Sequence, residues 1–373
     1  MARAMTWPTY TPACIADVAK LLRKGGSLSA YRANPKVGVG PKEGSQAYAL
    51  EREIERKFKV KHAVGVNSGT AALHAGLQAL GVKDRQVIVS PYTFSATVSA
   101  IVLAGGTPVF ADVDPYTFCI TPETVKPHIT RCTAAILPVH LFGYFQDLEG
   151  FKEFGLPVIE DACQSVGAQR GGSYSGSVGV AGAFSFNGSK NIPAGEGGAL
   201  VTNDSKIAEK ARLFVNHEEN FGSRDVGVNY RMHELVALLA RHGLRDLDER
   251  NERRRELVRQ LPRAIPDLKE ERLIADFGGR CDSEHVYYVA PFVVWGDRAA
   301  FIKRCAKRGV TIGAGYIQPP LHHYQAFRRY ATRKLPVVDE LSAKTLCLLY
   351  DFTPDKPLSY ARHVAKVVAE ALR

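Results

Sequence analysis

The stretch Gly182-Ala-Phe-Ser-Phe-Asn-Gly-Ser-Lys190-Asn-Ile-Pro-Ala-Gly-Glu-Gly-Gly198 sets a lysine in a glycine-rich turn, directly after a short apolar strand. Upstream, Pro157-Val-Ile-Glu-Asp161 is typical of a buried strand that ends in an acid. A buried acid is costly unless it has a partner. A lysine amine can hold the aldehyde of pyridoxal phosphate, and an aspartate can hold the proton on its ring nitrogen. The two patterns predict an enzyme that uses this cofactor, with Lys190 and Asp161 as its catalytic residues.

The composition indicates a globular protein. The chain has 373 residues, of which 45% are hydrophobic and 23% charged. No apolar run approaches the roughly 20 residues that span a bilayer, and the N-terminus lacks a signal-peptide core, so a cytoplasmic location is expected. Seven cysteines without a C-x-x-C pair do not indicate a disulfide framework.

The net charge is +11, which favours anionic ligands. The basic residues between 241 and 259 alternate with acids at helical spacing, a pattern typical of a solvated helix face. A nucleic-acid interface would show a one-signed stripe or a known binding module. Nucleic-acid binding is therefore the weaker interpretation of the charge.

Strand and helix patterns alternate through the first two thirds of the chain, which predicts an α/β fold with a mostly parallel sheet covered on both faces. Strands are expected at 62–66, 86–90, 107–112, 134–141, 157–162, 183–186 and 198–202, and helices at 70–80, 95–103 and 148–154. The glycine-rich stretch 25–44 is expected to be a loop. Ligands of such sheets bind beyond the carboxyl ends of the strands.

Two domains are expected. A large cofactor-binding domain would cover residues 1–245, and a smaller α+β domain would cover 246–373. A long helix at about 233–261 would bridge them. The small domain would hold a strand at 285–295 and helices at 299–308 and 360–372.

Several residues at predicted strand ends suit a phosphorylated pyridine ring. Ser68, Gly69 and Thr70 begin a helix, where free amides bind phosphate, although a simple capping role is the better explanation of this motif taken alone. Ser185 could add a hydroxyl to the phosphate. Phe94 could stack on the ring, with core packing as the alternative. Gln164 could donate a hydrogen bond to the phenolic oxygen of the ring.

The chain also carries a series of motifs: Asn67-Ser-Gly-Thr70, Pro91-Tyr-Thr-Phe94, Pro138-Val-His-Leu141, Glu160-Asp-Ala-Cys-Gln164, Ser185-Phe-Asn-Gly-Ser-Lys190, Gly195-Glu-Gly-Gly198 and Gly227-Val-Asn-Tyr-Arg-Met232. In this order they resemble the DegT/StrS-type aminotransferases, which are fold-type I, aspartate aminotransferase-like enzymes that use pyridoxal phosphate in sugar and cyclitol biosynthesis.

The resemblance implies a role for each matching residue. Lys190 would carry the Schiff base, Asp161 would pair with the pyridine nitrogen, and Gln164 would bind the ring oxygen. Phe94 would stack on the ring, and Gly69, Thr70 and Ser185 would bind the phosphate. Asn229 matches an asparagine that reaches the phosphate of the neighbouring subunit, so a homodimer with shared sites is expected.

The resemblance further implies an enzyme that transfers an amino group from glutamate or glutamine to a nucleotide-linked keto-sugar by a ping-pong reaction. Candidate substrate contacts are His140, Arg231, Tyr316 and His322, for each of which a structural role is the alternative. No metal is expected. Three other functions remain open: a keto-cyclitol (scyllo-inosose-like) aminotransferase of antibiotic precursors, a dehydratase of the same family, and a nucleic-acid-binding regulator on the same fold.

Overall fold

The structure is a computed structural model that describes residues 8–34, 38–218, 225–260, 285–294, 296–313, 315, 317–348 and 356–372. Its strands are β1 (Tyr31–Asn34), β2 (Gly38–Pro41), β3 (His62–Val66), β4 (Gln86–Val89), β5 (Thr107–Phe110), β6 (Thr133–Leu137), β7 (Ile159–Asp161), β8 (Gln169–Arg170), β9 (Ser173–Tyr174), β10 (Ala181–Ser185), β11 (Gly198–Thr202), β12 (Ala290–Val293) and β13 (Thr345–Leu348).

The α-helices are α1 (Pro12–Lys24), α2 (Gln46–Phe58), α3 (Gly69–Leu80), α4 (Ser95–Leu103), α5 (Pro122–Val125), α6 (Ser205–Val215), α7 (Glu234–Arg245), α8 (Leu247–Val258), α9 (Arg298–Ala306), α10 (Pro336–Lys344) and α11 (Leu358–Leu372). Short 3-10 helices are η1 (Lys126–His128), η2 (Leu141–Gly143), η3 (Glu149–Phe154), η6 (Leu321–His323) and η7 (Arg328–Tyr330). None of the helices within the described ranges is both long and apolar enough to cross a membrane.

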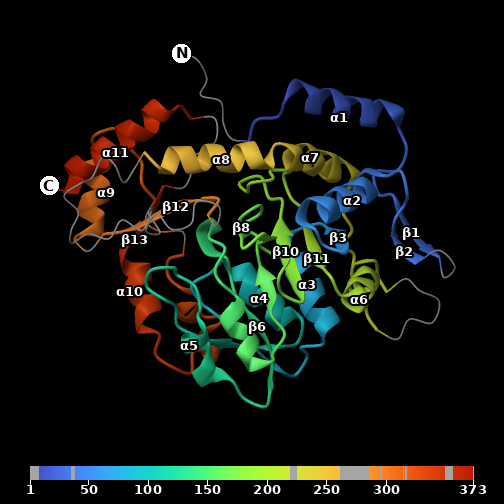
Figure 1. The fold of residues 1–373 in the computed structure, drawn as a ribbon, viewed down its shortest axis with the longest axis horizontal. Helices are drawn as coiled ribbons and strands as arrows, with labels where there is room; N and C mark the ends of the chain where they lie inside the picture. The colour runs from blue at the N-terminus through green and yellow to red at the C-terminus, as the bar shows by residue number, and fades with distance from the viewer. Residues whose placement is uncertain are drawn as a thin grey trace.

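A central sheet organises the molecule (Figure 1). Its strands run in the order β3-β11-β10-β7 on one side and β6-β4-β5 on the other. Parallel bridges from Ile136 to Val158 and from Val139 to Asp161 join the two parts between β6 and β7. β11 runs antiparallel to both of its neighbours, and the remaining pairs of this sheet are parallel. The mostly parallel sheet predicted from the sequence is confirmed.

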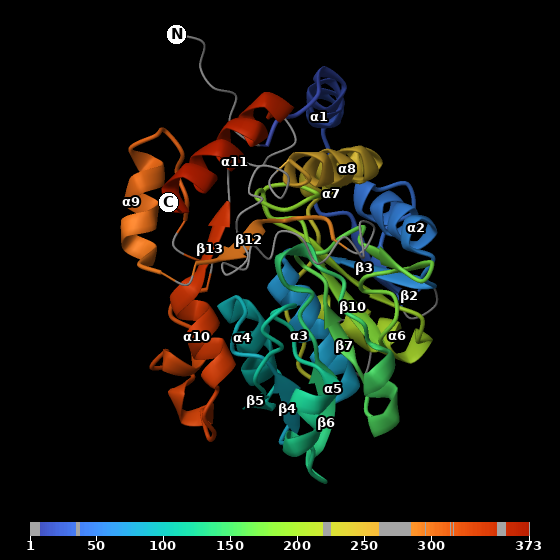
Figure 2. The ribbon, with the colours of Figure 1, turned by 60° about the vertical axis from the view of Figure 1, so that its left-hand side comes forward.

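Both faces of the sheet are buried, as the alternation of side chains along β11 shows. Ala199 and Val201 pack with α2 and α7, whereas Leu200 packs on the opposite face with α3 and α4. Successive residues of a strand point to opposite faces, so a strand that is apolar throughout needs cover on both sides. α2 and α7 supply one cover and α3 supplies the other (Figure 2).

A second, smaller core lies around β12 and β13. Phe292 of β12 and Phe301 of α9 pack there with Val364 of α11 and with Leu257 near the end of α8. α7 packs with α2 against one face of the central sheet, and α8 reaches the second core through Leu257, so we infer that the domain boundary lies near Asp246. The later segment around η6 and α10 returns through Leu321 and Val338 to the large core on the α3 face of the sheet, the first core.

Three of the expected elements differ from the structure. The helix predicted over 233–261 is two helices, because the chain turns at Asp246 from one core to the other. The segment 148–154 is a 3-10 helix that ends at Gly155 in a left-handed conformation. The stretch 25–44 contains the antiparallel strands β1 and β2. Backbone hydrogen bonds hold these strands together, and such bonds leave little trace in side-chain periodicity.

Candidate active site

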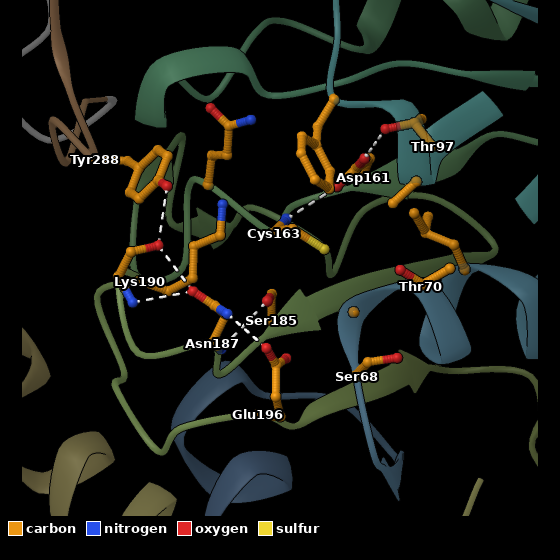
Figure 3. Close-up of a pocket in the computed structure, with 16 residues that line it drawn as sticks. Ser68, Thr70, Thr97, Asp161, Cys163, Ser185, Asn187, Lys190, Glu196 and Tyr288 are labelled. Atoms are coloured by element: carbon orange, nitrogen blue, oxygen red, sulfur yellow. Dashed lines mark hydrogen bonds between the residues drawn. The ribbon is translucent and has the colours of Figure 1, made fainter. Parts of the chain in front are cut away.

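A cavity of about 470 Å³ opens at the carboxyl edge of the central sheet (Figure 3). It is lined by Ser68, Gly69, Thr70, Leu73, Phe94, Ala96, Thr97, Asp161, Cys163, Gln164, Ser185, Asn187, Ser189, Lys190, Glu196 and Tyr288. Most of these residues follow the ends of β3, β4, β7 and β10, since the carboxyl ends of parallel strands share one edge. Eight of the sequence-predicted site residues line this one cavity: Ser68, Gly69, Thr70, Phe94, Asp161, Gln164, Ser185 and Lys190.

Lys190 stands on a turn that its own backbone holds closed. Its amide donates to the carbonyl of Asn187, and the amide of Gly188 donates to Gly195 across the loop. The side chain is only 8% exposed, and Nζ lies 3.8 Å from the centroid of the Tyr288 ring. An ammonium over an aromatic face is attracted by the ring quadrupole. The amine is therefore held at the cavity wall by a residue that comes from the other end of the chain.

Asp161 ends β7 with its carboxylate in the cavity and 5% of its surface exposed. The Thr97 hydroxyl donates to Oδ2 at 2.7 Å, and the amide of Cys163 donates to Oδ1 at 3.1 Å. These two donors fix the orientation of the carboxylate in the cavity. Burial, aided by the Asp161 charge, raises the pKa of the Cys163 thiol well above its usual range, so this thiol stays protonated.

The start of α3 forms a concave wall opposite Lys190. Ser68 caps the helix by accepting a hydrogen bond from Ala71, so the capping role weighed in the sequence analysis is present. The amides of the first turn, with the helix dipole behind them, still face the cavity and suit an anion. Thr70 and Ser185 add hydroxyls to the same lining.

Gly69 allows this wall to approach its neighbours. A Cβ at this position would lie 2.9 Å from Cys163 Sγ and 2.9 Å from Ser185 Cβ. We expect Gly69→Ala to lower the free energy of unfolding by about 1–3 kcal/mol, as overpacking does, and to weaken phosphate binding. Urea unfolding and fluorescence titration with pyridoxal phosphate measure the two effects. The matched control is Gly296→Ala, because a Cβ there meets no atom within 4 Å. Equal behaviour of the two variants would contradict the expectation.

Phe94 and Gln164 border the space between Asp161 and solvent. Phe94 is 54% exposed, although it is a large aromatic side chain that lines a cavity. The amide of Phe142 donates to Gln164 Oε1 at 2.9 Å, which fixes the carboxamide and leaves its NH₂ as the group that can donate to a ligand. An open aromatic face beside an oriented donor suits a planar polar ring.

The remaining predicted residues lie elsewhere. Asn229 is exposed and accepts two hydrogen bonds from Arg231, whose guanidinium also contacts Asn216. Neither Asn229 nor Arg231 lines the cavity in this chain. Tyr316 lies outside the described residues.

His140 and His322 are buried away from the cavity. Nε2 of His140 lies 2.8 Å from Glu160, which also accepts the amides of Gly176 and Gly179. The pair therefore holds a turn behind Asp161 in place. His322 contacts Asp339, and burial lowers the pKa of its imidazole despite that carboxylate. Both histidines have structural partners, in agreement with the structural role that was the alternative for each of them.

Sequence analysis overlooked Thr97 and Tyr288. Thr97 lies three residues after Phe94, on the first turn of α4, and this spacing could have indicated that both residues face the site. Tyr288 precedes β12 in the second half of the chain, and no local pattern connects it with Lys190. Asn187 and Glu196, joined by a hydrogen bond of 2.8 Å, also face the cavity.

Comparison with known proteins now decides the family. Residues 33–367 match the model of the DegT/DnrJ/EryC1/StrS aminotransferase family. The chain belongs to this family. As a DegT/StrS-type protein it is an aminotransferase, and the sequence-based prediction is confirmed.

The individual relatives of this DegT/StrS-type protein include a regulatory protein and sugar aminotransferases. A "pleiotropic regulatory protein" of Geobacillus stearothermophilus is 34% identical over 345 residues, which cover 88% of this chain and 90% of that protein. A UDP-N-acetyl-3-dehydro-alpha-D-glucosamine 3-aminotransferase of Acidithiobacillus ferrooxidans is 34% identical over 313 residues, covering 82% and 83%. The crystal structure of S. venezuelae DesV in complex with a ketimine intermediate superposes with a TM-score of 0.85 at 28% identity, covering 96% and 94%. The fold is that of the fold-type I aminotransferases.

Proposed function

We propose that this protein is a pyridoxal-phosphate-dependent aminotransferase that moves an amino group from glutamate or glutamine to a nucleotide-linked keto-sugar. The observation that carries the proposal is that Lys190 and Asp161, 29 residues apart in the sequence, line one cavity together with the start of α3. A covalent anchor, a buried carboxylate and an anion-binding helix start are the three groups that this cofactor requires.

The residues present fit the cofactor. Gly69 leaves a cradle between Cys163 and Ser185 that a methyl group would fill, so a bound phosphate can approach the backbone there. The exposed face of Phe94 offers stacking surface for the ring. Asp161 is held by two donors, which keeps its carboxylate aimed into the cavity. Lys190 reaches the same space from the opposite wall.

The chain's own residues account for the proton movements. When bound, pyridoxal phosphate supplies the aldehyde and the electron sink. The Asp161 carboxylate holds the proton of the ring nitrogen, because an ionised acid stabilises a neighbouring cation. Nζ of Lys190 would be the base that takes a proton from the α-carbon of the amino donor. Such a positioned base contributes about 10²–10⁴-fold to the rate.

The acceptor class rests on the relatives. By its name, the Acidithiobacillus protein transfers an amino group to a UDP-linked 3-dehydro sugar, which is a ketone. We propose an acceptor of the same chemical class for this protein. A keto-cyclitol remains the alternative acceptor, since it presents the same carbonyl and hydroxyls. The exposed position of Asn229 is compatible with a homodimer in which it reaches the partner's phosphate.

A nucleic-acid-binding regulator is the alternative of another class. It is favoured by the name of the Geobacillus relative and by the net charge of +11. Regulation would not require Lys190, Asp161 and the α3 start to meet in one cavity. Such binding would weaken steeply with salt concentration.

A substrate screen tests the proposal. The protein loaded with pyridoxal phosphate is mixed with glutamate or glutamine, and the visible absorption of the loaded form is expected to fall. Addition of the correct keto-sugar restores the absorption and yields an amino sugar, whereas a donor-free mixture yields none. If every nucleotide-linked keto-sugar fails and a keto-inositol succeeds, the acceptor assignment is wrong. If the donors leave the absorption unchanged, the aminotransferase proposal itself fails.

A further inference from the structure

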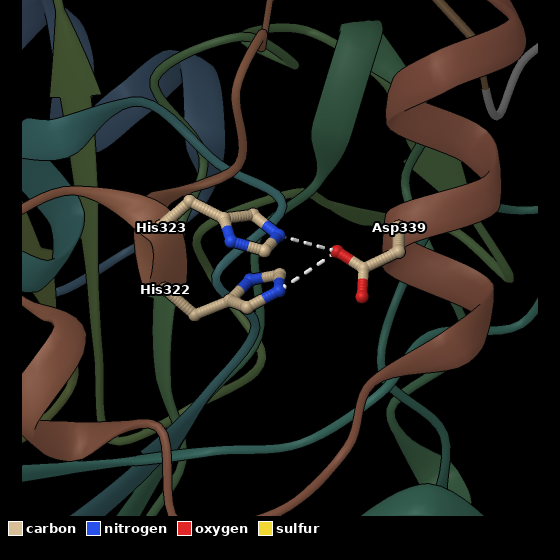
Figure 4. A group of neighbouring side chains, drawn as sticks. All are labelled: His322, His323 and Asp339. Atoms are coloured by element: carbon tan, nitrogen blue, oxygen red, sulfur yellow. Dashed lines mark hydrogen bonds and ion pairs between the residues drawn. The ribbon is translucent and has the colours of Figure 1, made fainter.

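A cluster of two histidines and an aspartate lies outside the cofactor cavity (Figure 4). His322 and His323 belong to η6, and Asp339 belongs to α10. Oδ1 of Asp339 lies 2.9 Å from Nε2 of His322 and 2.7 Å from Nε2 of His323. The three ligand atoms all lie within 4.8 Å of one another. Imidazole nitrogens and a carboxylate oxygen that converge on one point are a donor set for a divalent metal.

We propose that His322, His323 and Asp339 bind a Zn²⁺ ion that joins η6 to α10. Tetrahedral Zn²⁺ with bonds of about 2.0–2.2 Å places neighbouring ligand atoms about 3.3–3.4 Å apart. The two measured N···O distances are shorter than this by about half an ångström. Asp339 Oδ1 therefore needs only a small movement away from the two imidazole nitrogens to admit the ion.

The side chains that would move are the solvent-exposed ones. The side chains of His323 and Asp339 are 51% and 48% exposed, whereas that of His322 is 8% exposed. The backbone of η6 is fixed as well, since the amide of Leu321 donates to the carbonyl of Pro91. His322 thus provides a rigid first ligand, and the exposed side chains of His323 and Asp339 can adjust to the ion from the solvent side. Their exposure leaves the fourth position to water.

The surrounding charge also favours a cation. Asp112 accepts the amides of Val337 and Val338 at the first turn of α10, which offsets the positive end of that helix next to the cluster. The charge of Asp112 also acts on His322. Two carboxylates beside two imidazoles form a site whose charge a dication neutralises. Nε2 is the nitrogen that His322 offers to the cluster, since it lies next to Asp339 Oδ1.

The ion would have a structural role. It would close the loop between residues 323 and 339 and hold η6 against Pro91, whose loop leads to Phe94 at the cavity. The two histidines are neighbours in sequence and Asp339 follows sixteen residues later on another helix, a spacing that matches no common metal motif. The sequence analysis expected no metal.

Metal titration of the holoenzyme tests this site. Untagged protein carrying Cys132→Ser, which removes an exposed thiol, is stripped with a chelator and titrated with Zn²⁺ by calorimetry. We expect one equivalent to bind. Asp339→Asn and His323→Gln should each weaken binding at least about tenfold, since even the loss of an outer partner of a metal ligand costs about 10–100-fold. His363→Gln, which removes an exposed histidine of α11, is the matched control and should bind as the parent does.

Two results overturn the proposal: no saturable binding of Zn²⁺ by the parent protein, or binding that both cluster variants retain. Thermal unfolding of each variant verifies its fold, and the midpoint of the parent should rise with added Zn²⁺. Co²⁺ provides a test without substitution. A nitrogen and oxygen ligand set gives visible d–d bands without thiolate charge-transfer bands, and a thiolate spectrum would place the ion elsewhere.

Discussion

Lys190→Ala is expected to abolish transamination and covalent retention of the cofactor. In the proposed function the amine at the cavity wall is both the anchor for the aldehyde and the base that moves the proton, so both functions are lost together. Loss of a positioned base alone slows turnover by about 10²–10⁴-fold, and loss of the anchor adds to this. Borohydride reduction followed by peptide mass analysis should label Lys190 with a pyridoxyl group in the parent protein and leave the variant unlabelled.

Two control variants separate the covalent role from charge and from general damage. Lys190→Arg keeps a cation over the Tyr288 ring but cannot hold the aldehyde, so it should be as inactive as the alanine variant. Lys206→Ala removes an exposed lysine at the start of α6 and should change neither labelling nor rate. Normal turnover by Lys190→Ala, or labelling at another lysine in the parent, would refute the assignment.

Asp161→Ala is expected to reduce activity far more than stability, because in the proposed function the charged partner of this carboxylate is the cofactor. A hydrogen bond to a charged group contributes about 1.5–3 kcal/mol, which corresponds to a rate loss of about 10- to 150-fold, and loss of the electron sink increases it. Steady-state kinetics and thermal unfolding of the same preparations compare the two effects. A loss of stability that accounts for the whole loss of rate would assign Asp161 a structural role.

Thr97→Val is the informative companion. It removes the hydroxyl that donates to Asp161 Oδ2 but leaves the carboxylate and its charge in place. Its effect on the rate should therefore be smaller than that of Asp161→Ala. Asp161→Asn keeps the shape and loses the charge, so it should resemble the alanine variant. If Asp161→Asn keeps the parent rate, the charge of the residue is not what the reaction uses.

Residues next to strand ends were predictable from local sequence. Ser68, Phe94, Asp161 and Ser185 each follow or end an apolar strand, and parallel strands bring their carboxyl ends to one edge. The period of the apolar residues predicts the strands. The residues at the strand ends can then be assigned to one edge without knowing any long-range contact. Local pattern was therefore sufficient for the residues that bind the cofactor in the proposed function.

Contacts between distant segments were not predictable in this way. Tyr288 reaches Lys190 across 98 residues of chain, and Thr97 reaches Asp161 across 64. His140 was a reasonable candidate by position, yet its side chain points away from the cavity to Glu160. A residue's place in a strand or turn is local information, whereas the direction of a buried side chain depends on which partner the packing brings to it.

The sequence by itself determined the α/β order, the lysine turn and the strand-end acid, because apolar periodicity and glycine placement act over a few residues. Only the tertiary structure decided that Lys190 faces Asp161 across one cavity, that Tyr288 lies over the amine, and that η6 meets α10 at His322, His323 and Asp339. These contacts depend on the geometry of the sheet and on the return of the chain from the second core to the first. Such long-range packing is set by the burial of whole faces, which short stretches of sequence do not encode.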